Sequence, residues 1–239
     1  MSDHSHLAAN WADIRRRVDE ACHAAGRDPA EVTILPVSKT FGVEAIRAAM
    51  ALGLRRFGEN RVQEIRDKAA ALDGCGIEWV VIGHLQTNKA HDVARLASEV
   101  QSLDRPQLAA ALHRQLVAAG RTMDVLVQVK TAAEDSKYGL DPAQLPIFLD
   151  SLRDYPTLRP RGLMTLATHS EDPHVVRACF RQLRQLRDQA AARGHDLPRL
   201  SMGMSGDFPL AIAEGATEIR IGTAIFGARA QPAAVPAAP

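Results

Sequence analysis

The sequence has few of the features that assign a chain to a specialised class of protein. It has three widely spaced cysteines and no Cys-x-x-Cys pair, so neither a disulfide framework nor a zinc site is indicated. Lys plus Arg total 29 against 28 Asp plus Glu, and aromatic residues make up 4%, which argues against a nucleic-acid partner. No signal peptide is recognisable, and no run approaches the roughly 20 apolar residues of a membrane span. We therefore expect a reduced, cytoplasmic protein without a membrane partner.

The rest of the composition is that of an ordinary globular protein. The chain has 239 residues, 46% of them hydrophobic, which is enough for one large domain with a sizeable core. Apolar residues spaced three and four apart predict an amphipathic helix over 7–25 that ends at Gly26. We expect residues 1–230 to form a single domain, and the Ala/Pro-rich segment 231–239 to be a disordered tail.

Short apolar runs alternate with helical segments along the remainder of the domain. Such alternation implies parallel strands joined by right-handed crossovers. Eight strands within about 200 residues fit a closed (β/α)8 TIM barrel, in the α/β class, better than an open sheet. The predicted strands are 32–37, 55–58, 78–82, 100–103, 124–129, 161–166, 200–202 and 218–221.

Lys39 stands at the carboxyl end of the first predicted strand, where barrels of this type place their chemistry. A lysine amine beside apolar side chains is readily desolvated, and its neutral form attacks a carbonyl carbon to form an imine. The structural alternative is a lysine that leaves the barrel rim for solvent.

Two small-residue turns follow the seventh and eighth predicted strands. Ser205 and Gly206 lie in the first turn, and Gly222 and Thr223 lie in the second. Glycine lets the backbone approach an anion, and hydroxyls and backbone amides donate hydrogen bonds to it. Each turn alone is typical of ordinary structure, but the pair at these two strand ends favours a phosphate site.

Arg220 precedes the second turn, and strand alternation directs its side chain toward the barrel interior. One interpretation is an internal salt bridge, with Glu59 among the candidate partners. The other is an arginine that faces the ring nitrogen of a bound pyridine, as occurs in some pyridoxal phosphate (PLP) proteins. Asn60, after the second strand, is predicted either to cap the following helix or to face the barrel mouth. Lys137 is a second lysine expected at the mouth.

Seven motifs, in order along the chain, resemble the pyridoxal phosphate homeostasis protein family. They are Pro36-Val-Ser-Lys-Thr, Phe57-Gly-Glu-Asn-Arg-Val-Gln-Glu, His84-Leu-Gln-Thr-Asn-Lys, Ser136-Lys-Tyr-Gly, Arg161-Gly-Leu-Met-Thr, Ser201-Met-Gly-Met-Ser and Arg220-Ile-Gly-Thr-Ala-Ile-Phe-Gly. The resemblance covers residues 7–230 and implies a barrel like the N-terminal domain of alanine racemase. The chain departs from the family pattern after Leu166, where Ala167-Thr-His-Ser-Glu-Asp-Pro replaces a shorter turn.

The resemblance also implies a set of cofactor-binding residues. Lys39 would carry PLP as an imine, and Arg220 would face the pyridine nitrogen. The phosphate would be held by Ser205, Gly222 and Thr223, with help from Gly206. Asn60 and Met164 would border the ring, and Lys137 would be an accessory lysine at the mouth.

The function implied is intracellular vitamin B6 homeostasis without a standard catalytic reaction. An arginine at the ring nitrogen disfavours its protonation and weakens PLP as an electron sink. The chain ends soon after the eighth strand, so we expect no second catalytic domain of the racemase kind. We expect a monomer that exchanges PLP with amines or apo PLP-dependent enzymes. The alternatives are a low-activity amino-acid racemase using Lys39 and Tyr138, and a phosphosugar enzyme whose Lys39 forms an imine with its substrate.

Overall fold

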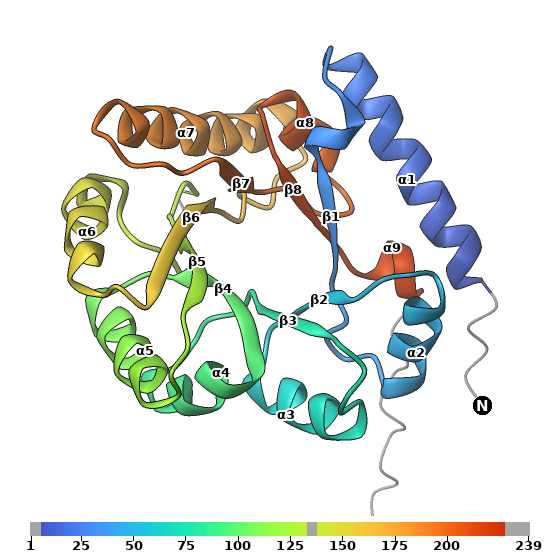
Figure 1. The fold of residues 1–239 in the computed structure, drawn as a ribbon. Helices are drawn as coiled ribbons and strands as arrows, with labels where there is room; N and C mark the ends of the chain where they lie inside the picture. The colour runs from blue at the N-terminus through green and yellow to red at the C-terminus, as the bar shows by residue number, and fades with distance from the viewer. Residues whose placement is uncertain (1–5, 133–137, 228–239) are drawn as a thin grey trace, which may run out of the picture.

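The strands form one parallel sheet that curls into a nearly closed barrel, with the helices on its outside (Figure 1). The computed structural model describes residues 6–132 and 138–227. The strands lie in the order β1-β8-β7-β6-β5-β4-β3-β2, and a parallel bridge between Val37 and Gly58 joins the two ends of that order. The expected α/β barrel is therefore confirmed. Its strands are β1 (Thr33–Pro36), β2 (Arg56–Glu59), β3 (Glu78–Val81), β4 (Ala97–Leu103), β5 (Met123–Gln128), β6 (Leu158–Met164), β7 (Arg199–Ser201) and β8 (Glu218–Ile221).

Helices alternate with the strands and cover the outer face of the barrel. Those between strands are α2 (Val43–Ala51), α3 (Val62–Ala71), α4 (Ala90–Leu96), α5 (Pro106–Ala118), α6 (Leu145–Ser151), α7 (Pro173–Ala192) and α8 (Phe208–Ala213), while α1 (Leu7–Ala24) precedes β1 and α9 (Thr223–Phe226) follows β8. Across the described parts of the chain, every helix is too short or too polar to span a lipid bilayer.

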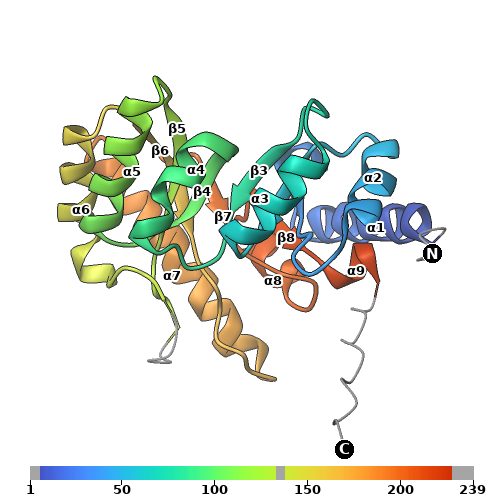
Figure 2. The ribbon, with the colours of Figure 1, turned by 90° about the horizontal axis from the view of Figure 1, so that it is seen from below.

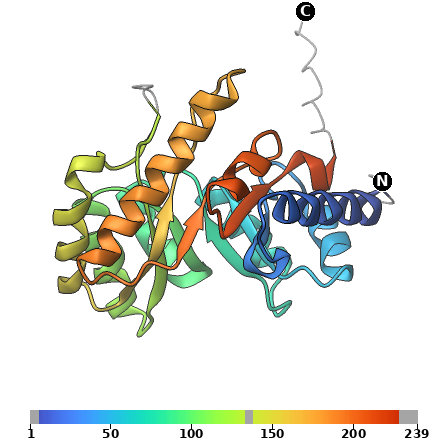
Figure 3. The same ribbon diagram turned by 90° about the horizontal axis from the view of Figure 1, so that it is seen from above.

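The predicted amino-terminal helix packs outside the barrel against the elements at the other end of the sequence. Figures 2 and 3 show α1 beside α8 and α9, and the Asn10 side chain donates a hydrogen bond of 3.1 Å to the carbonyl oxygen of Ile225 in α9. Its buried residues are Leu7, Ile14, Val18 and Cys22, which form the apolar stripe that the sequence predicts.

Some element boundaries differ from the prediction, for identifiable reasons. β6 begins at Leu158 rather than at residue 161, although Pro160 cannot donate a ladder hydrogen bond. The strand tolerates this proline because the β5–β6 register shifts beside it, where Val125 pairs with Pro160 and Leu126 with Gly162. The short helix α9 was not expected, because four residues are too few to show helical periodicity.

The amino-terminal half of the barrel interior holds charged side chains rather than apolar ones. Arg56 reaches Glu218 at 2.6 Å and Glu99 at 2.8 Å, and Arg199 contacts the same two carboxylates at 2.8 and 2.9 Å. Gln101 donates to both of these glutamates. Burial would raise the pKa of Glu218, but the charges of Arg56 and Arg199 outweigh it and hold that pKa below its ordinary value. We call these five residues the amino-end network.

Candidate functional site

The carboxyl ends of β1, β7 and β8 bring the predicted lysine and the two small-residue turns together. The Val37 amide, two residues before Lys39, donates to the Ile221 carbonyl at 2.8 Å. A Cβ atom placed on Gly222 would lie 3.4 Å from the Val37 carbonyl oxygen, so the turn after β8 touches the Lys39 segment. Lys39 itself is half-buried. The structure thus places Lys39 beside the expected phosphate turn.

The turn after β7 packs closely on α8, and Gly203 permits this approach. Its φ is +96°, and a Cβ atom there would lie 2.7 Å from the Cβ atom of Ala211 in α8. The Gly203 carbonyl accepts a hydrogen bond of 3.0 Å from the Arg220 amide, which connects β8 to this turn. A larger residue at position 203 would collide with Ala211 and displace α8.

The two turns present hydrogen-bond donors of the kind that bind a phosphate. Within the described residues, the backbone amides of Ser205, Gly206 and Thr223 donate to no other group of the chain. Ser205 and Thr223 add hydroxyls, and no atom lies within 4 Å of the position that a Cβ would take on Gly206. This donor set, with open space beside Gly206, fits an oxyanion.

Arg220 points into the barrel and is held by neutral groups. Its guanidinium donates to the Ser201 hydroxyl at 2.8 Å and to the Thr165 carbonyl at 2.7 Å. Among the residues that the structure describes, no carboxylate forms an ion pair with it, so the expected salt bridge with Glu59 is wrong. Complete burial lowers the pKa of Arg220 to about 10, against the opposing charges of Glu218 and Asp207. The guanidinium therefore remains charged at neutral pH.

Asn60 and Met164 lie at the ends of two further strands. The N-cap of α3 is Arg61 and no side chain caps this helix, so the helix-capping role predicted for Asn60 is wrong. The Asn60 backbone is packed against Gly83, where a Cβ would lie 2.3 Å from the Asn60 carbonyl oxygen. Met164 is fully buried, and it pairs in register with Gln128 and Ser201.

The mouth also carries an aromatic contact between the loops after β3 and β5. The rings of Tyr138 and His84 are stacked with centroids 3.8 Å apart, and His84 Nδ1 lies 3.6 Å from an oxygen of Asp104. Tyr138 is 59% exposed. Lys137, the predicted accessory lysine, lies outside the described residues.

A group of buried charges beside Lys39 was missed at the level of sequence. The Lys68 amine contacts Glu59 at 2.6 Å, Glu64 at 3.1 Å and the carbonyl of Ser38 at 2.9 Å. Burial raises the pKa of Glu59, although Lys68 and Ser38 act against it. Burial would also raise the pKa of Glu64, but hydrogen bonds from the Thr40 amide and from Lys68 lower it overall. One feature of the sequence could have revealed this group: Lys68 falls on the same helix face as Val62 and Ile65, which are buried on α3.

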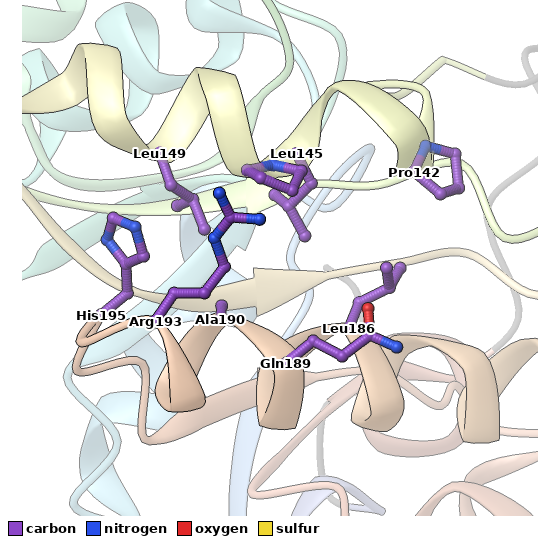
Figure 4. Close-up of a pocket in the computed structure, with 9 residues that line it drawn as sticks. Pro142, Leu145, Leu149, Leu186, Gln189, Ala190, Arg193 and His195 are labelled. Carbon is purple, nitrogen blue, oxygen red and sulfur yellow. The ribbon is translucent and has the colours of Figure 1, made fainter.

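A small pocket lies elsewhere, in the outer layer between α6 and α7 (Figure 4). Leu145, Leu149 and Leu186 line it, and His195 at its edge lies 3.2 Å from Asp150. None of the predicted cofactor residues in the described ranges lines this pocket. It is therefore a gap between two helices and separate from the candidate site.

The fold and the arrangement at the strand ends define a barrel of the alanine racemase N-terminal type, and the model for the family "Alanine racemase, N-terminal domain" matches residues 2–230. Two similar curated proteins, from Pseudomonas aeruginosa and Escherichia coli, are each named pyridoxal phosphate homeostasis protein. The Pseudomonas aeruginosa protein is 43% identical over 225 residues, which cover 94% of this chain and 96% of that protein. The Escherichia coli protein is 40% identical over 232 residues, which cover 93% of this chain and 97% of that protein. The chain belongs to the pyridoxal phosphate homeostasis protein family.

Solved structures agree with this assignment. PipY of Synechococcus elongatus, in a structure described as having PLP bound, is 39% identical with a TM-score of 0.77, and the match covers 88% of this chain and 100% of that one. A protein of unknown function from Bifidobacterium adolescentis is 34% identical with a TM-score of 0.87 over 94% and 97% of the two chains. An alanine racemase from Clostridium difficile shares the fold. It is 12% identical with a TM-score of 0.70, and the match covers 89% of this chain and 56% of that one.

Proposed function

We propose that this chain binds PLP covalently and reversibly at Lys39 and acts in intracellular vitamin B6 homeostasis without a catalytic reaction of its own. Family membership and the PLP-bound structure of PipY support the choice of cofactor. The observation that carries the proposal is the position of Lys39 beside the turns of Ser205 and Thr223, whose amides have no partner among the described residues. An amine and an oxyanion cradle are the two groups that an aldehyde phosphate requires.

Each expected residue that the structure describes is proposed to have one role, and Lys137 is kept from the sequence-based prediction. Lys39 supplies the amine that binds the aldehyde carbon, and PLP, when bound, supplies that aldehyde. The amides of Ser205, Gly206 and Thr223, the adjacent Gly222 and the two hydroxyls hold the phosphate. Arg220 donates toward the pyridine nitrogen. Asn60 and Met164 border the ring, and Lys137 serves as a further amine at the mouth.

Arg220 favours storage over catalysis. Its guanidinium is charged at neutral pH and is fixed by Ser201 and Thr165. A fixed positive charge at the pyridine nitrogen disfavours protonation of that atom, and an unprotonated ring stabilises a carbanion poorly. This weaker electron sink supports a role in holding the cofactor.

We infer that PLP leaves the site by exchange of the Lys39 amine for another amine, including that of an apo PLP-dependent enzyme. The half-buried position of Lys39 at the barrel mouth leaves a path for such exchange. We further propose that the protein works in the cytoplasm as a monomer. Gel filtration with light scattering of the full chain tests the monomeric state.

The deciding experiment follows the absorbance of the protein after incubation with PLP. Borohydride reduction and peptide mass mapping then locate the label on wild type, Lys39→Ala and Lys89→Ala, which removes another lysine near the mouth. We expect an imine band that disappears on reduction, with the pyridoxyl mass on the Lys39 peptide in wild type and in Lys89→Ala. No imine band, or label scattered over surface lysines in wild type, would overturn the proposal and favour a phosphosugar substrate.

The racemase alternative is tested separately through Tyr138, the tyrosine at the mouth. Racemisation of alanine and serine is measured with the PLP-loaded protein and with Tyr138→Phe. We expect no multiple turnovers in either protein. Sustained turnover that is lost in Tyr138→Phe while PLP remains bound would establish an enzyme instead.

A further inference from the structure

The two peptide neighbours of Lys39 are held by one group of buried charges. On the amino-terminal side, the carbonyl of Ser38 accepts a hydrogen bond of 2.9 Å from the Lys68 amine. On the carboxyl-terminal side, the Thr40 amide donates to Glu64 at 2.7 Å. Lys68 and Glu64 are themselves 3.1 Å apart, so a single ion pair on α3 holds the backbone on both sides of Lys39.

Thr40 shows that this backbone needs such support. Its φ of +68° makes it the one residue other than glycine with a positive φ in the described residues. A threonine in the left-handed region is disfavoured because its branched side chain is crowded against the backbone, and it persists only where surrounding contacts fix it. The hydrogen bond from its amide to Glu64 is such a contact.

Glu59 fixes the ion pair from the sheet side. It is fully buried, and one of its oxygens accepts hydrogen bonds from Lys68 at 2.6 Å and from the Ser38 hydroxyl at 2.6 Å. Its other oxygen has no hydrogen-bond partner among the described residues. Ser38 is thus bound through its hydroxyl to Glu59 and through its carbonyl to Lys68, so its peptide unit has little freedom to rotate.

We propose that Glu59, Lys68 and Glu64, which we call the lysine clamp, are positioning residues that aim the Lys39 side chain at the aldehyde of PLP. This inference rests on the proposed function, since it concerns the same lysine. The peptide units before and after Lys39 are both held in place, so the backbone sets the direction in which the Lys39 side chain projects. The amine therefore starts close to the geometry in which it attacks, which raises the rate of capture and directs it to this lysine.

The test measures how fast and where PLP becomes attached. The imine band is followed after mixing PLP with the ligand-free protein, and borohydride label is then mapped over all lysine peptides. Lys68→Met removes the donor to Ser38, Glu64→Ala removes the acceptor for Thr40, and Lys68→Arg retains a cation that can bond to all three partners. We expect the imine band to appear at least tenfold more slowly in Lys68→Met and Glu64→Ala, and more of the label to be found on other lysines. In Lys68→Arg, we expect both the rate and the fraction of label on Lys39 to return most of the way to the wild-type values.

A matched control separates positioning from stability. Arg177→Met removes a partner that lies 2.5 Å from the buried carboxylate of Glu214, on the opposite side of the sheet order from α3. It should lower the melting temperature without changing the rate or the site of labelling. If Lys68→Met does not fold, the double variant Glu59→Gln/Lys68→Met, which leaves no unpaired buried charge, takes its place.

The outcomes distinguish this inference from the function on which it rests. Suppose that Lys39 is labelled at the wild-type rate in folded Glu64→Ala and in folded Lys68→Met or the double variant. This result would overturn the clamp and leave PLP attachment intact. An equal loss of rate in Arg177→Met would also overturn it, because the effect would then follow stability alone. Wild-type protein without label on Lys39 would instead overturn the proposed function.

Discussion

The two ends of the barrel interior are both polar and buried, but they differ in how fully their charges are paired. At the amino ends of the strands, Glu99 and Glu218 are each bonded to two arginines and to Gln101. At the carboxyl ends, Arg220 has only a hydroxyl and a carbonyl as partners. The amides of Ser205 and Gly206 have no partner among the described residues.

This difference separates structure from function better than burial does. The charges of the amino-end network are paired with one another, and within the described residues the network is linked to Arg220 only through the Ser201 hydroxyl, so we assign it to the scaffold. Amides that have no partner among the described residues and lie in half-buried or exposed turns are available to a ligand. Buried charge alone would have selected the wrong end of the barrel.

The largest expected effect comes from opening the amino-end network. Glu218→Leu leaves Arg56 and Arg199 with only Glu99 in a buried site, and breaking a buried pair in this way costs about 3–5 kcal/mol. We expect the free energy of unfolding of the ligand-free protein, measured by urea denaturation, to fall by that amount. A loss below about 1 kcal/mol would show that the network is not the scaffold we describe.

The second-largest effect is expected from acid, which acts on the same network. The pKa of Glu218 is lowered in the folded protein, so its contribution to stability is present above its unfolded pKa, near 4.5, and is lost as the pH falls toward the folded pKa. The pKa of Glu64 is also lowered in the folded protein, so its contribution to stability is likewise lost on acidification. We expect the melting temperature to drop below about pH 4.5 and to drop less steeply in Glu218→Gln. Parallel acid profiles in the two proteins would contradict this.

At the opposite end, Arg220→Met should affect binding rather than stability. Met removes a buried charge that forms no ion pair with a described residue, and the desolvation cost removed with it offsets the loss of the hydrogen bonds to Ser201 and Thr165. We expect an unchanged or higher free energy of unfolding without PLP, and an affinity for PLP weakened about tenfold or more, by loss of a charged hydrogen bond. Calorimetric titration measures the affinity, and a stability loss like that of Glu218→Leu would remove the contrast between the two ends.

The smallest effect is expected at the phosphate turn. Ser205→Ala removes one hydroxyl donor, so PLP affinity should fall about tenfold, as expected for one hydrogen bond to a charged group. The melting temperature of the ligand-free protein should not change, because the Ser205 side chain forms no hydrogen bond within the described residues. Equal affinity in mutant and wild type would remove Ser205 from the site.

The sequence was sufficient for the fold because its signals were local and repeated. Each predicted strand from 32–37 to 218–221 overlaps an observed one, because short apolar runs alternate with helical segments along the whole domain. The boundaries of β4 and β6 were less clear. Ala97, Ser98 and Glu99 have no strand preference of their own, and they join β4 through pairing with β3 and β5.

Side-chain partners were predicted less well, because they depend on how distant segments meet. Arg220 was correctly directed inward by strand alternation, but its partners come from β7 and from the residue after β6. The lysine clamp joins residues of β2 and α3 to the segment that follows β1. The only feature of the sequence that indicated it is the position of Lys68 on the apolar stripe of a helix. The roles of the nine predicted cofactor residues stay predictions until the experiments above are done.

The pairing of β1 with β8 sets when the site comes into being during synthesis. Thr33 is hydrogen-bonded to Thr217, 184 residues later in the chain, and Lys39 lies beside a turn formed by Gly222. A nascent chain therefore carries its lysine from the start but cannot hold a phosphate beside it until the last strand has left the ribosome. On the proposed function, capture of the PLP aldehyde at Lys39 would require the pairing of β1 with β8.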